Sequence, residues 1–259
     1  MNHCTLKRAA LALCATACLT ASAAASAADA APPPVLKALE ARGASGWKEF
    51  KAGGDLRGFA GVAGTNPVTV YVTRDGSAVL GMRVDAQGEP MDKQTVDELV
   101  AKPLEEAAWR GVEATRWVRD GRADAPRVVY VFTDANCPWC HRFFDAAKPW
   151  VDAGKVQLRQ IYVGVIRADS AAKAAAILEA PDPVEAARRN ERDFDKNDIA
   201  PLKTIPEATR QLLAADLQLM DSLGFRGTPG ILWHGPDGRL KTLGGFPQGD
   251  RLAEVLGPR

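Results

Sequence analysis

Cysteine and histidine are scarce in this sequence of 259 residues. It holds five cysteines, three of them within the first 18 residues, and three histidines. A zinc site needs about four ligands, most often cysteine or histidine. Beyond the first 18 residues the chain offers only Cys137, Cys140, His141 and His234. We therefore expect no metal site. As a separate expectation, the protein binds no cofactor.

Neither sign of charge is in excess, since 33 basic residues face 32 acidic ones. Nucleic acids and anionic membranes attract proteins with a marked positive excess, so we expect no nucleic-acid partner. The sequence also lacks an apolar run of the roughly 20 residues that a membrane-spanning helix requires. The longest candidate, from Ala9 to about Leu19, is too short.

That short apolar run has the surroundings of a secretory signal peptide. Lys7 and Arg8 precede it, and small residues ending in Ala25-Ser26-Ala27 follow it, which is the order of an export signal. We expect residues 1–28 to be removed by cleavage near Ala27 or Ala28. The exported chain of about 231 residues then carries a net charge of −1, because the leader contains two cations and no acid.

Removal of the leader leaves Cys137 and Cys140 as the remaining cysteines. Exported proteins meet conditions in which disulfides persist. A bridge between residues three apart closes almost no loop, however, so it removes little entropy from the unfolded chain. The pair is therefore better explained by chemistry than by stabilisation.

Hydrophobic patterns divide the rest of the chain into three parts. Residues 29–91 combine a short helical pattern with alternating strands around an Asp75-Gly76 turn, which predicts a small α+β domain. A domain of this size buries little surface, so association with a second copy would stabilise it. Residues 92–120 have helical spacing interrupted by Pro103, which predicts a broken or kinked linker helix.

Residues 121–259 show the order strand, helix, strand, several helices, two strands and a final helix. The uninterrupted apolar run at residues 128–132 is typical of a strand buried on both faces. The pattern from Cys137 to about Val151 predicts the helix after it, and residues 156–165 and 231–233 predict further strands. This order indicates an α/β thioredoxin fold with a helical insertion at about residues 169–223.

The segment Cys137-Pro138-Trp139-Cys140 lies where the first of these strands meets its helix. Free N–H groups and the dipole at a helix N-terminus favour a thiolate, and cysteines there commonly have pKa values of ~3.5 to 7.5. We expect Cys137 to be the nucleophile, and Cys140, deeper in the helix and less exposed, to resolve the mixed disulfide. Pro138 suits the first helical turn. Trp139 is expected to be exposed beside the thiol, and His141 to have a modest electrostatic effect on the thiolate.

Two alternatives stay open on these residues. The segment from Cys137 to His141 matches the Cys-x-x-Cys-His motif of c-type haem attachment, although here it begins a helix directly after a buried strand. The chain can also be a chaperone-like holdase, a binding module in which the thiols are secondary.

The sequence resembles thiol:disulfide interchange proteins of the DsbG/DsbC family, DsbG more closely than DsbC, from about Pro34 to Gly257. The likeness is strongest at residues 125–132 (APRVVYVF), 137–140 (CPWC), 149–159 (PWVDAGKVQLR) and 163–166 (VGVI). The chain departs from the DsbG motif at Trp139, where that motif has tyrosine, and at His141, which follows the motif.

This resemblance implies a periplasmic homodimer that acts as a disulfide isomerase or reductase, with sulfenic-acid reduction in some members. It implies an N-terminal dimerisation domain and exported clients that contain cysteines or disulfides. A membrane thiol reductant of the DsbD type is implied as the source of electrons. In thioredoxin-like proteins the residues at Thr228 and Pro229 are joined by a cis peptide bond that faces the active cysteines, so we expect these two residues to bind substrate.

Overall fold

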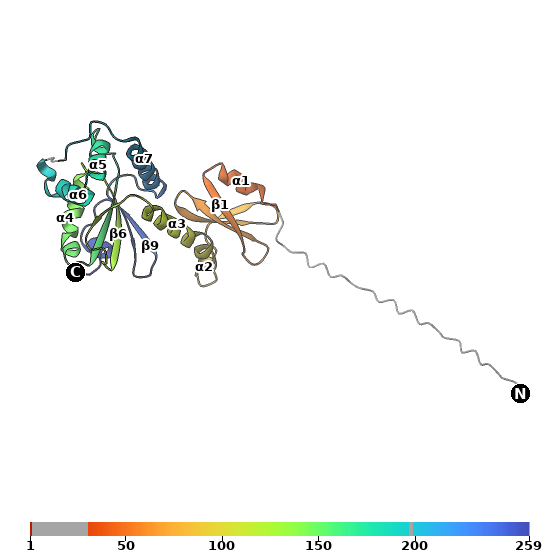
Figure 1. The fold of residues 1–259 in the computed structure, drawn as a ribbon. Helices are drawn as coiled ribbons and strands as arrows, with labels where there is room; N and C mark the ends of the chain where they lie inside the picture. The colour runs from red at the N-terminus through yellow and green to blue at the C-terminus, as the bar shows by residue number, and fades with distance from the viewer. Residues whose placement is uncertain (2–30, 197–198, 259) are drawn as a thin grey trace. The chain divides into compact units, whose positions relative to one another are not determined.

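The computed structural model describes residues 1, 31–196 and 199–258. The predicted signal peptide, residues 1–28, therefore lies outside the described residues except for Met1. From Pro33 onward the chain forms one compact unit that contains two β-sheets (Figure 1). Within the described ranges, no helix is both long enough and apolar enough to cross a bilayer.

The first sheet is antiparallel and follows the chain order β1-β2-β3-β4. Its strands are β1 (Ala44–Lys51), β2 (Arg57–Ala63), β3 (Asn66–Val72) and β4 (Ala78–Leu80). The expected hairpin joins β3 to β4, and Gly76 supplies the left-handed backbone conformation (φ 84°) that the turn requires. The helix α1 (Pro34–Glu40) covers one face of the sheet with the buried side chain of Leu36.

The predicted linker helix is irregular just before Pro103. It consists of α2 (Lys93–Val96), a π-helical turn η1 (Asp97–Ala101) and α3 (Lys102–Glu113). Proline has no N–H to donate to the carbonyl of Leu99, four residues earlier. That carbonyl instead accepts a hydrogen bond from Lys48 Nζ of β1 at 2.7 Å. The first sheet thus satisfies a backbone group that the proline leaves open.

The structure differs from the prediction at the end of this linker. We expected the linker helix to extend to about residue 120, but α3 ends at Glu113. Just after its last turn, the Thr115 hydroxyl donates a hydrogen bond to the Val112 carbonyl at 2.8 Å. Val118–Asp120 form β5, an edge strand that pairs antiparallel with β7. Only three residues of alternating burial make this strand, which is too little pattern to distinguish it from a helix end.

The second sheet has the strand order β5-β7-β6-β8-β9. Its longer strands are β6 (Arg127–Thr133), β7 (Val156–Tyr162), β8 (Gly230–His234) and β9 (Leu240–Gly244). β6 and β7 are parallel and are joined through α4 (Pro138–Asp152), whereas the other pairs are antiparallel. This is the thioredoxin fold that the sequence order predicts.

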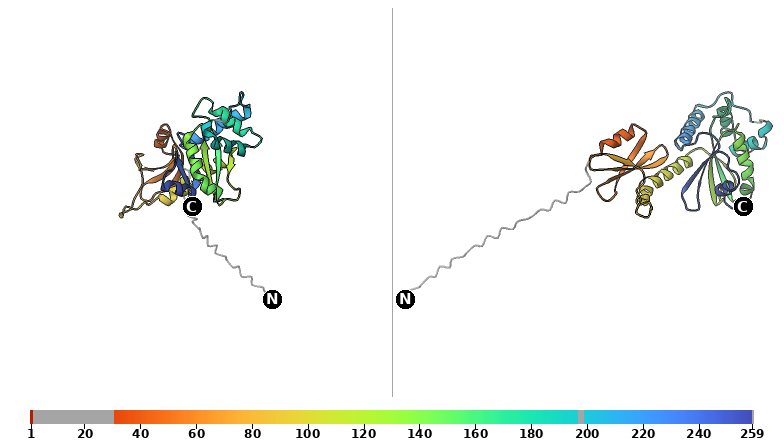
Figure 2. Two further views of the ribbon diagram at one scale, coloured as in Figure 1. Left: turned by 90° about the vertical axis from the view of Figure 1, so that its left-hand side faces the viewer. Right: turned by 180° about the vertical axis from the view of Figure 1, so that it is seen from behind.

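Helices cover both faces of the second sheet (Figure 2). Successive side chains of a strand point to opposite faces, so Val129 and Val131 pack with α4 and α8 (Asp250–Leu256). Tyr130 and Phe132 pack on the other side, with residues of α3 and α7. Burial on both faces explains why residues 128–132 form an uninterrupted apolar run.

The helical insertion lies between β7 and β8, and its helices pack in an apolar core that also includes Val118 of β5 and Tyr162 of β7. It contains α5 (Ser170–Leu178), α6 (Pro183–Arg192), a single 3₁₀ turn η2 (Phe194–Lys196) and α7 (Glu207–Ser222). Prolines stand at the start of α6 and just before α7, where they begin helices rather than break them. Its first and last helices lie within the predicted range 169–223.

Candidate active site

The dithiol segment joins the carboxyl end of β6 to the N-terminus of α4. Cys137 is the N-cap residue, with an extended backbone, and its Sγ accepts a hydrogen bond from the backbone N–H of Cys140 at 3.4 Å. Pro138 occupies the first helical position, where no N–H is needed. The helix therefore presents free N–H groups to the sulfur of Cys137, in agreement with the sequence analysis.

Cys137 is the more acidic of the two thiols. Hydrogen bonding with the Cys140 thiol lowers the pKa of Cys137 to about 6, against the opposing effect of burial, and the N–H groups of Cys140 and Trp139 contribute further. Most Cys137 side chains are then thiolates at neutral pH, which is the nucleophilic form.

Cys140 has the opposite character. Burial raises the pKa of the Cys140 thiol well above its ordinary value, and the negative charge of Cys137 raises it further. The two titrations are linked, because the thiol of one cysteine stabilises a negative charge on the neighbouring sulfur, whereas two thiolates side by side would repel each other. Near neutral pH the pair therefore holds one thiolate, at Cys137, and one thiol, at Cys140.

The expected difference in exposure between the cysteines is wrong. The accessible fraction is 1% for Cys137 and 4% for Cys140, so solvent reaches neither in this conformation. The N-cap position brings Cys137 against the loop before β8, which covers its sulfur.

That covering loop contains Thr228 and Pro229, whose peptide bond is cis, as expected. The Thr228 carbonyl accepts a hydrogen bond from the Cys137 thiol at 3.4 Å, a contact that favours the protonated sulfur. The Thr228 hydroxyl is buried and has no hydrogen-bond partner. It is thus able to donate to the sulfur once Cys137 ionises, and this interaction lowers the pKa of Cys137.

Trp139 is 45% exposed, which confirms the expectation for this side chain. The guanidinium of Arg142 lies 4.5 Å from the centre of its ring, at cation–π distance. On another side Phe246 stacks with it at a centroid distance of 6.4 Å. The indole is therefore held in place beside the dithiol while part of it remains open to solvent.

The His141 side chain faces carboxylates. Its Nδ1 lies 3.1 Å from Glu191 Oε2, its Nε2 lies 3.4 Å from Asp145 Oδ2, and its ring stacks on Phe194 at 4.5 Å. The effect that we expected it to have on the Cys137 thiolate stays a prediction. The sequence did not predict these contacts with Glu191, Asp145 and Phe194.

The sequence analysis missed a buried polar network around the active-site loop, residues 134–136, which leads from β6 to Cys137. The carboxylate of Asp134 accepts hydrogen bonds from the backbone N–H groups of Asn136, Val165 and Ile166 and from the Ser170 hydroxyl, at 2.7 to 3.0 Å. It thereby ties the loop before Cys137 to the segment that follows β7.

Asn136, directly before Cys137, extends this network into α5. Its Nδ2 donates to Ser170 Oγ at 2.9 Å and to Asp169 Oδ1 at 3.0 Å, and its Oδ1 accepts from Lys173 Nζ at 2.8 Å. Lys173 is a 1% exposed lysine, and buried lysines are rare unless paired. One feature of the sequence could have revealed this network: two polar residues, Asp134 and Asn136, follow directly after a fully buried strand.

Glu191 of α6 is the second group that the sequence analysis missed. Its side chain is 3% exposed, and burial raises the pKa of Glu191 to about 7. In the sequence it stands within a charged run, residues 188–192, which is typical of a solvated helix face. Only the fold of the insertion brings it against His141 of α4.

Comparison with known proteins identifies close relatives. No family model matches the chain. The thiol:disulfide interchange protein DsbG of Pseudomonas aeruginosa is 44% identical over 228 residues, 88% of this chain and 89% of the relative. The thiol:disulfide interchange protein DsbG of Escherichia coli is 36% identical over 227 residues, 87% of this chain and 91% of the relative.

Solved structures of Helicobacter pylori DsbG and of the catalytic domain of Proteus mirabilis ScsC also resemble the chain. The first is 17% identical with a TM-score of 0.41 and covers 77% of this chain and 98% of its own. The second is 20% identical with a TM-score of 0.45 and covers 58% of this chain and 93% of its own. The identity to the two curated relatives extends over most of both sequences, and the chain therefore belongs to the DsbG family of thiol:disulfide interchange proteins.

Proposed function

We propose that this protein acts on exported client proteins in the periplasm as a disulfide isomerase or reductase, through Cys137 and Cys140. One observation carries the proposal: the same helix N-terminus holds a thiol of lowered pKa, Cys137, and a thiol of raised pKa, Cys140. The first is ionised and ready to attack, whereas the second keeps its proton until a mixed disulfide has formed.

The reaction begins when the Cys137 thiolate attacks one sulfur of a client disulfide. The client S–S bond breaks, a Cys137–client bond forms, and the other client sulfur leaves as a thiolate. In isomerisation, a client thiolate then attacks the mixed disulfide and regenerates Cys137. In reduction, Cys140 loses its proton and attacks Cys137 Sγ, which releases the client thiol and leaves a Cys137–Cys140 disulfide.

Reduction consumes the dithiol, so a source of electrons is required. By analogy with the resembled family, we assign this role to a membrane thiol reductant of the DsbD type. Thr228 and Pro229, which lie against the Cys137 sulfur, are proposed to contact the client backbone. The exposed part of Trp139, with Val165 and Ile166, which are 40% and 43% exposed, offers an apolar surface for unfolded segments.

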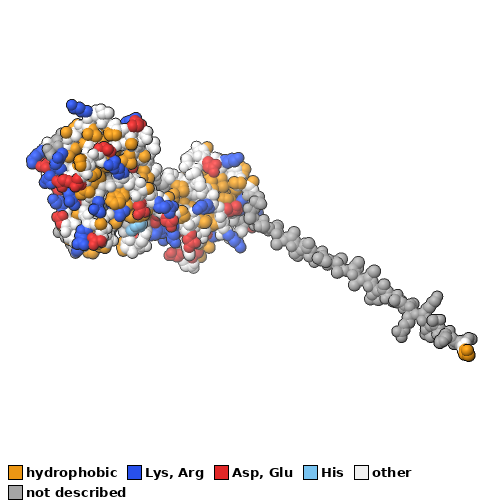
Figure 3. Space-filling model, viewed as in Figure 1, with side chains coloured by type: hydrophobic (Ala, Val, Ile, Leu, Met, Phe, Trp, Pro, Cys, Tyr) orange, Lys and Arg blue, Asp and Glu red, His pale blue; other side chains and the backbone are white. Residues whose placement is uncertain are grey.

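We also propose that the protein is a homodimer that associates through the β4 side of the first sheet. β4 is an edge strand in the described part of the chain, and exposed edges tend to pair or to be covered. Val79 and Leu80 of β4, and Met82 just after it, are 58% to 65% exposed. Apolar side chains reach the surface on this module as well as on the catalytic one (Figure 3).

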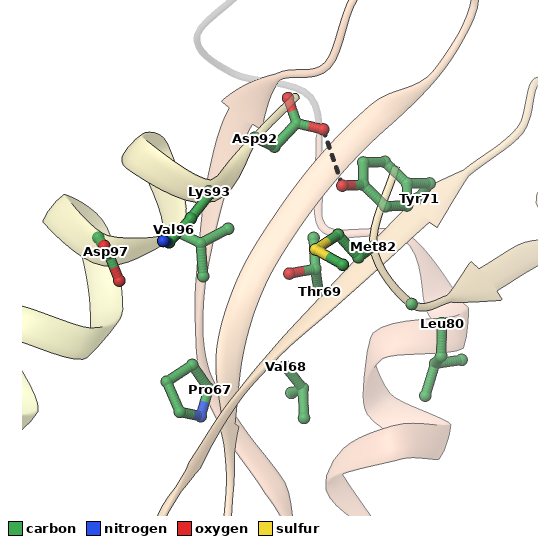
Figure 4. Close-up of a pocket in the computed structure, with 11 residues that line it drawn as sticks. Pro67, Val68, Thr69, Tyr71, Leu80, Met82, Asp92, Lys93, Val96 and Asp97 are labelled. Atoms are coloured by element: carbon green, nitrogen blue, oxygen red, sulfur yellow. Dashed lines mark hydrogen bonds between the residues drawn. The ribbon is translucent and has the colours of Figure 1, made fainter. Parts of the chain in front are cut away.

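A groove of about 360 Å³ lies beside this edge, lined by apolar side chains that include Val68, Leu80, Met82 and Val96 (Figure 4). Tyr71 and Asp92 also line the groove, and the Tyr71 hydroxyl donates a hydrogen bond to the Asp92 carboxylate at 2.8 Å. A second copy that inserts apolar side chains here would cover both the groove and the β4 edge.

The order of attack is tested by trapping. Cys140→Ala should accumulate mixed disulfides with exported clients, because Cys137 attacks but nothing resolves the product. Cys137→Ala should accumulate none. The reverse pattern would contradict the assignment of the two cysteines.

The direction of exchange is tested on a client with non-consecutive disulfides, supplied in scrambled oxidised form. We expect the reduced protein to restore its activity; rescue of only fully reduced clients by the oxidised protein would identify an oxidase instead. Haem attachment is disfavoured because both thiols are buried within the fold and both His141 ring nitrogens face carboxylates. The exposed apolar surface near the dithiol favours holdase activity as a second function, which Cys137→Ala should retain.

A further inference from the structure

A small cavity lies against Cys140, between the catalytic sheet and the helices α4 and α6. Its polar lining comes from three elements: Thr133 at the end of β6, Gln160 of β7 and Glu191 of α6, together with Cys140 itself. Its volume is about 10 Å³, close to the space that a single water molecule requires. The Gln160 Nε2 group is buried and has no hydrogen-bond partner. A water molecule in the cavity would accept a hydrogen bond from it.

Glu191 connects this cavity to solvent through His141. The Glu191 side chain is 3% exposed, that of His141 22% and that of Asp145 56%. The Glu191 carboxylate lies 3.1 Å from one ring nitrogen of His141, and the other ring nitrogen lies 3.4 Å from Asp145. A proton can therefore pass from one titratable group to the next, from the buried cavity to the surface.

The exchange reaction needs such a path at one step only. Cys137 attacks as a thiolate that already exists, so no proton has to move. Cys140 is a thiol near neutral pH, because burial raises its pKa. It becomes a nucleophile only after its proton has been transferred, and bulk solvent does not reach its sulfur.

We propose that Glu191 accepts the proton of Cys140 across this cavity, through one bridging water, and exchanges it with solvent by way of His141. The inference rests on the proposed exchange through Cys137 and Cys140. In the forward step the Cys140 S–H proton moves to the water, and a water proton moves to the Glu191 carboxylate. The resulting Cys140 thiolate attacks Cys137 Sγ, and the client sulfur leaves with the bonding electron pair.

The surroundings of Glu191 suit it to both acceptance and release of a proton. Burial raises the pKa of Glu191 to about 7, and the contact with His141 opposes that rise while Asp145 adds to it. Tyr162 of β7 is fully buried and burial raises its pKa well above the ordinary value, so it stays neutral. Asp120 of β5, which also faces this region, is paired with Arg188 at 3.2 Å.

A purely structural role for Glu191, as an anchor of α6 on α4, predicts different behaviour. An anchor affects stability and both steps of exchange alike. A proton acceptor affects the Cys140 step alone and gives that step a characteristic pH profile.

The test uses the reduced full-length exported chain and dithiobisnitrobenzoate, followed by stopped-flow absorbance. Cys137 releases the first coloured thiolate in a phase whose rate rises with reagent concentration. Cys140 releases the second in a phase whose rate does not. We expect Glu191→Gln to slow the second phase at neutral pH by at least about tenfold and to leave the first phase unchanged.

In the wild-type protein the second phase should slow as the pH falls below about 7, because Glu191 becomes protonated and can no longer accept a proton. Glu191→Gln should lose this inflection, and Glu191→Asp, which keeps a carboxylate, should recover part of the rate. Glu185→Gln is the matched control, since Glu185 is an exposed carboxylate on the same helix. It should behave like the wild type.

A second phase that is equally fast and has the same pH profile in Glu191→Gln would overturn the relay. If both phases slowed together, Glu191 would be an anchor and the relay would again be wrong. The pH profile of the wild-type protein alone decides the matter if Glu191→Gln does not fold. Failure of the proposed exchange looks different: the wild type would release fewer than two thiolates, or Cys140→Ala would still release two.

Discussion

The acidity of Cys137 depends on Cys140 more than on any other group. Hydrogen bonding with the Cys140 thiol is the largest influence that lowers the pKa of Cys137, ahead of Thr228 and of the helix N–H groups. The resolving cysteine therefore serves the first step of exchange as well as the second. This dependence can be separated from the effect of the helix by substitution at position 140.

We predict that Cys140→Ala raises the pKa of Cys137 above its value of about 6. In the wild type, the rate of Cys137 alkylation by iodoacetamide should fall as the pH drops through about 6, because the lowered pKa keeps the thiolate down to that pH. In Cys140→Ala the same fall should occur at a higher pH. Cys140→Ser, which retains a hydroxyl donor, should lie between the two, and identical midpoints in all three proteins would contradict the assignment.

Residue types around the dithiol were predictable to different degrees. Cys137, Pro138 and Trp139 were predictable because the motif and its place between strand and helix are local in sequence. Glu191 was not, because it is 50 residues from His141 and its neighbours in the chain are mostly charged. The burial of Cys137 was also missed, because the loop that covers it lies 91 residues away.

At the scale of elements, the helical insertion does more than fill a connection between two strands. α5 contributes Ser170 and Lys173 to the network around Asn136, and α6 contributes Glu191 to the cavity behind Cys140. The insertion thus supports the loop before Cys137, and the loop before β8 covers the Cys137 sulfur.

We predict that Asn136→Ala destabilises the protein and loosens the loop that carries Cys137. The change removes the acceptor of Lys173 Nζ and the donor to Ser170 in a buried setting, so the free energy of unfolding should fall by about 1 to 3 kcal/mol. Urea denaturation of the reduced protein measures this loss. Asn66→Ala, at an exposed position of β3, should change the stability by much less.

The elements themselves were largely predictable where their patterns were long. The buried run of β6, the amphipathic helix α4 and the turn before β4 all carry local signals. β5 was missed because it has three residues, and the π-helical turn η1 could be placed only as a break near Pro103. The Leu99 carbonyl of η1 accepts its hydrogen bond from Lys48, which lies 51 residues earlier in β1, and no local pattern reveals such a contact.

At the scale of the whole molecule, the linker connects a catalytic sheet to a sheet with no catalytic residue of its own. α3 is attached to the catalytic side by Glu105, whose carboxylate accepts hydrogen bonds from Arg239 at 2.6 to 3.1 Å, and by Trp109, which packs edge-on against Tyr130. η1 contributes Val100 to the core of the first sheet. The linker therefore shares a core with each sheet, and a dimer built on the first sheet would hold two catalytic sites in one particle.

The dimer proposal places the contact at β4, so charge introduced there should separate the subunits. We predict that the double variant Leu80→Lys, Met82→Lys sediments as a folded monomer at micromolar concentration, whereas the wild-type exported chain sediments as a dimer. Both side chains are more than half exposed in the single chain, so the substitutions should leave its fold intact and act only by burying two cations in the contact.

Ile166→Lys is the control, because Ile166 is an exposed apolar residue of the catalytic module and its substitution should leave the dimer unchanged. A monomeric wild type would rule out dimerisation, and a dimeric double variant would move the contact away from β4. A fragment from residue 102 onward, which keeps α3 and β5 with the catalytic sheet, should be a folded monomer that retains both thiolate-release phases.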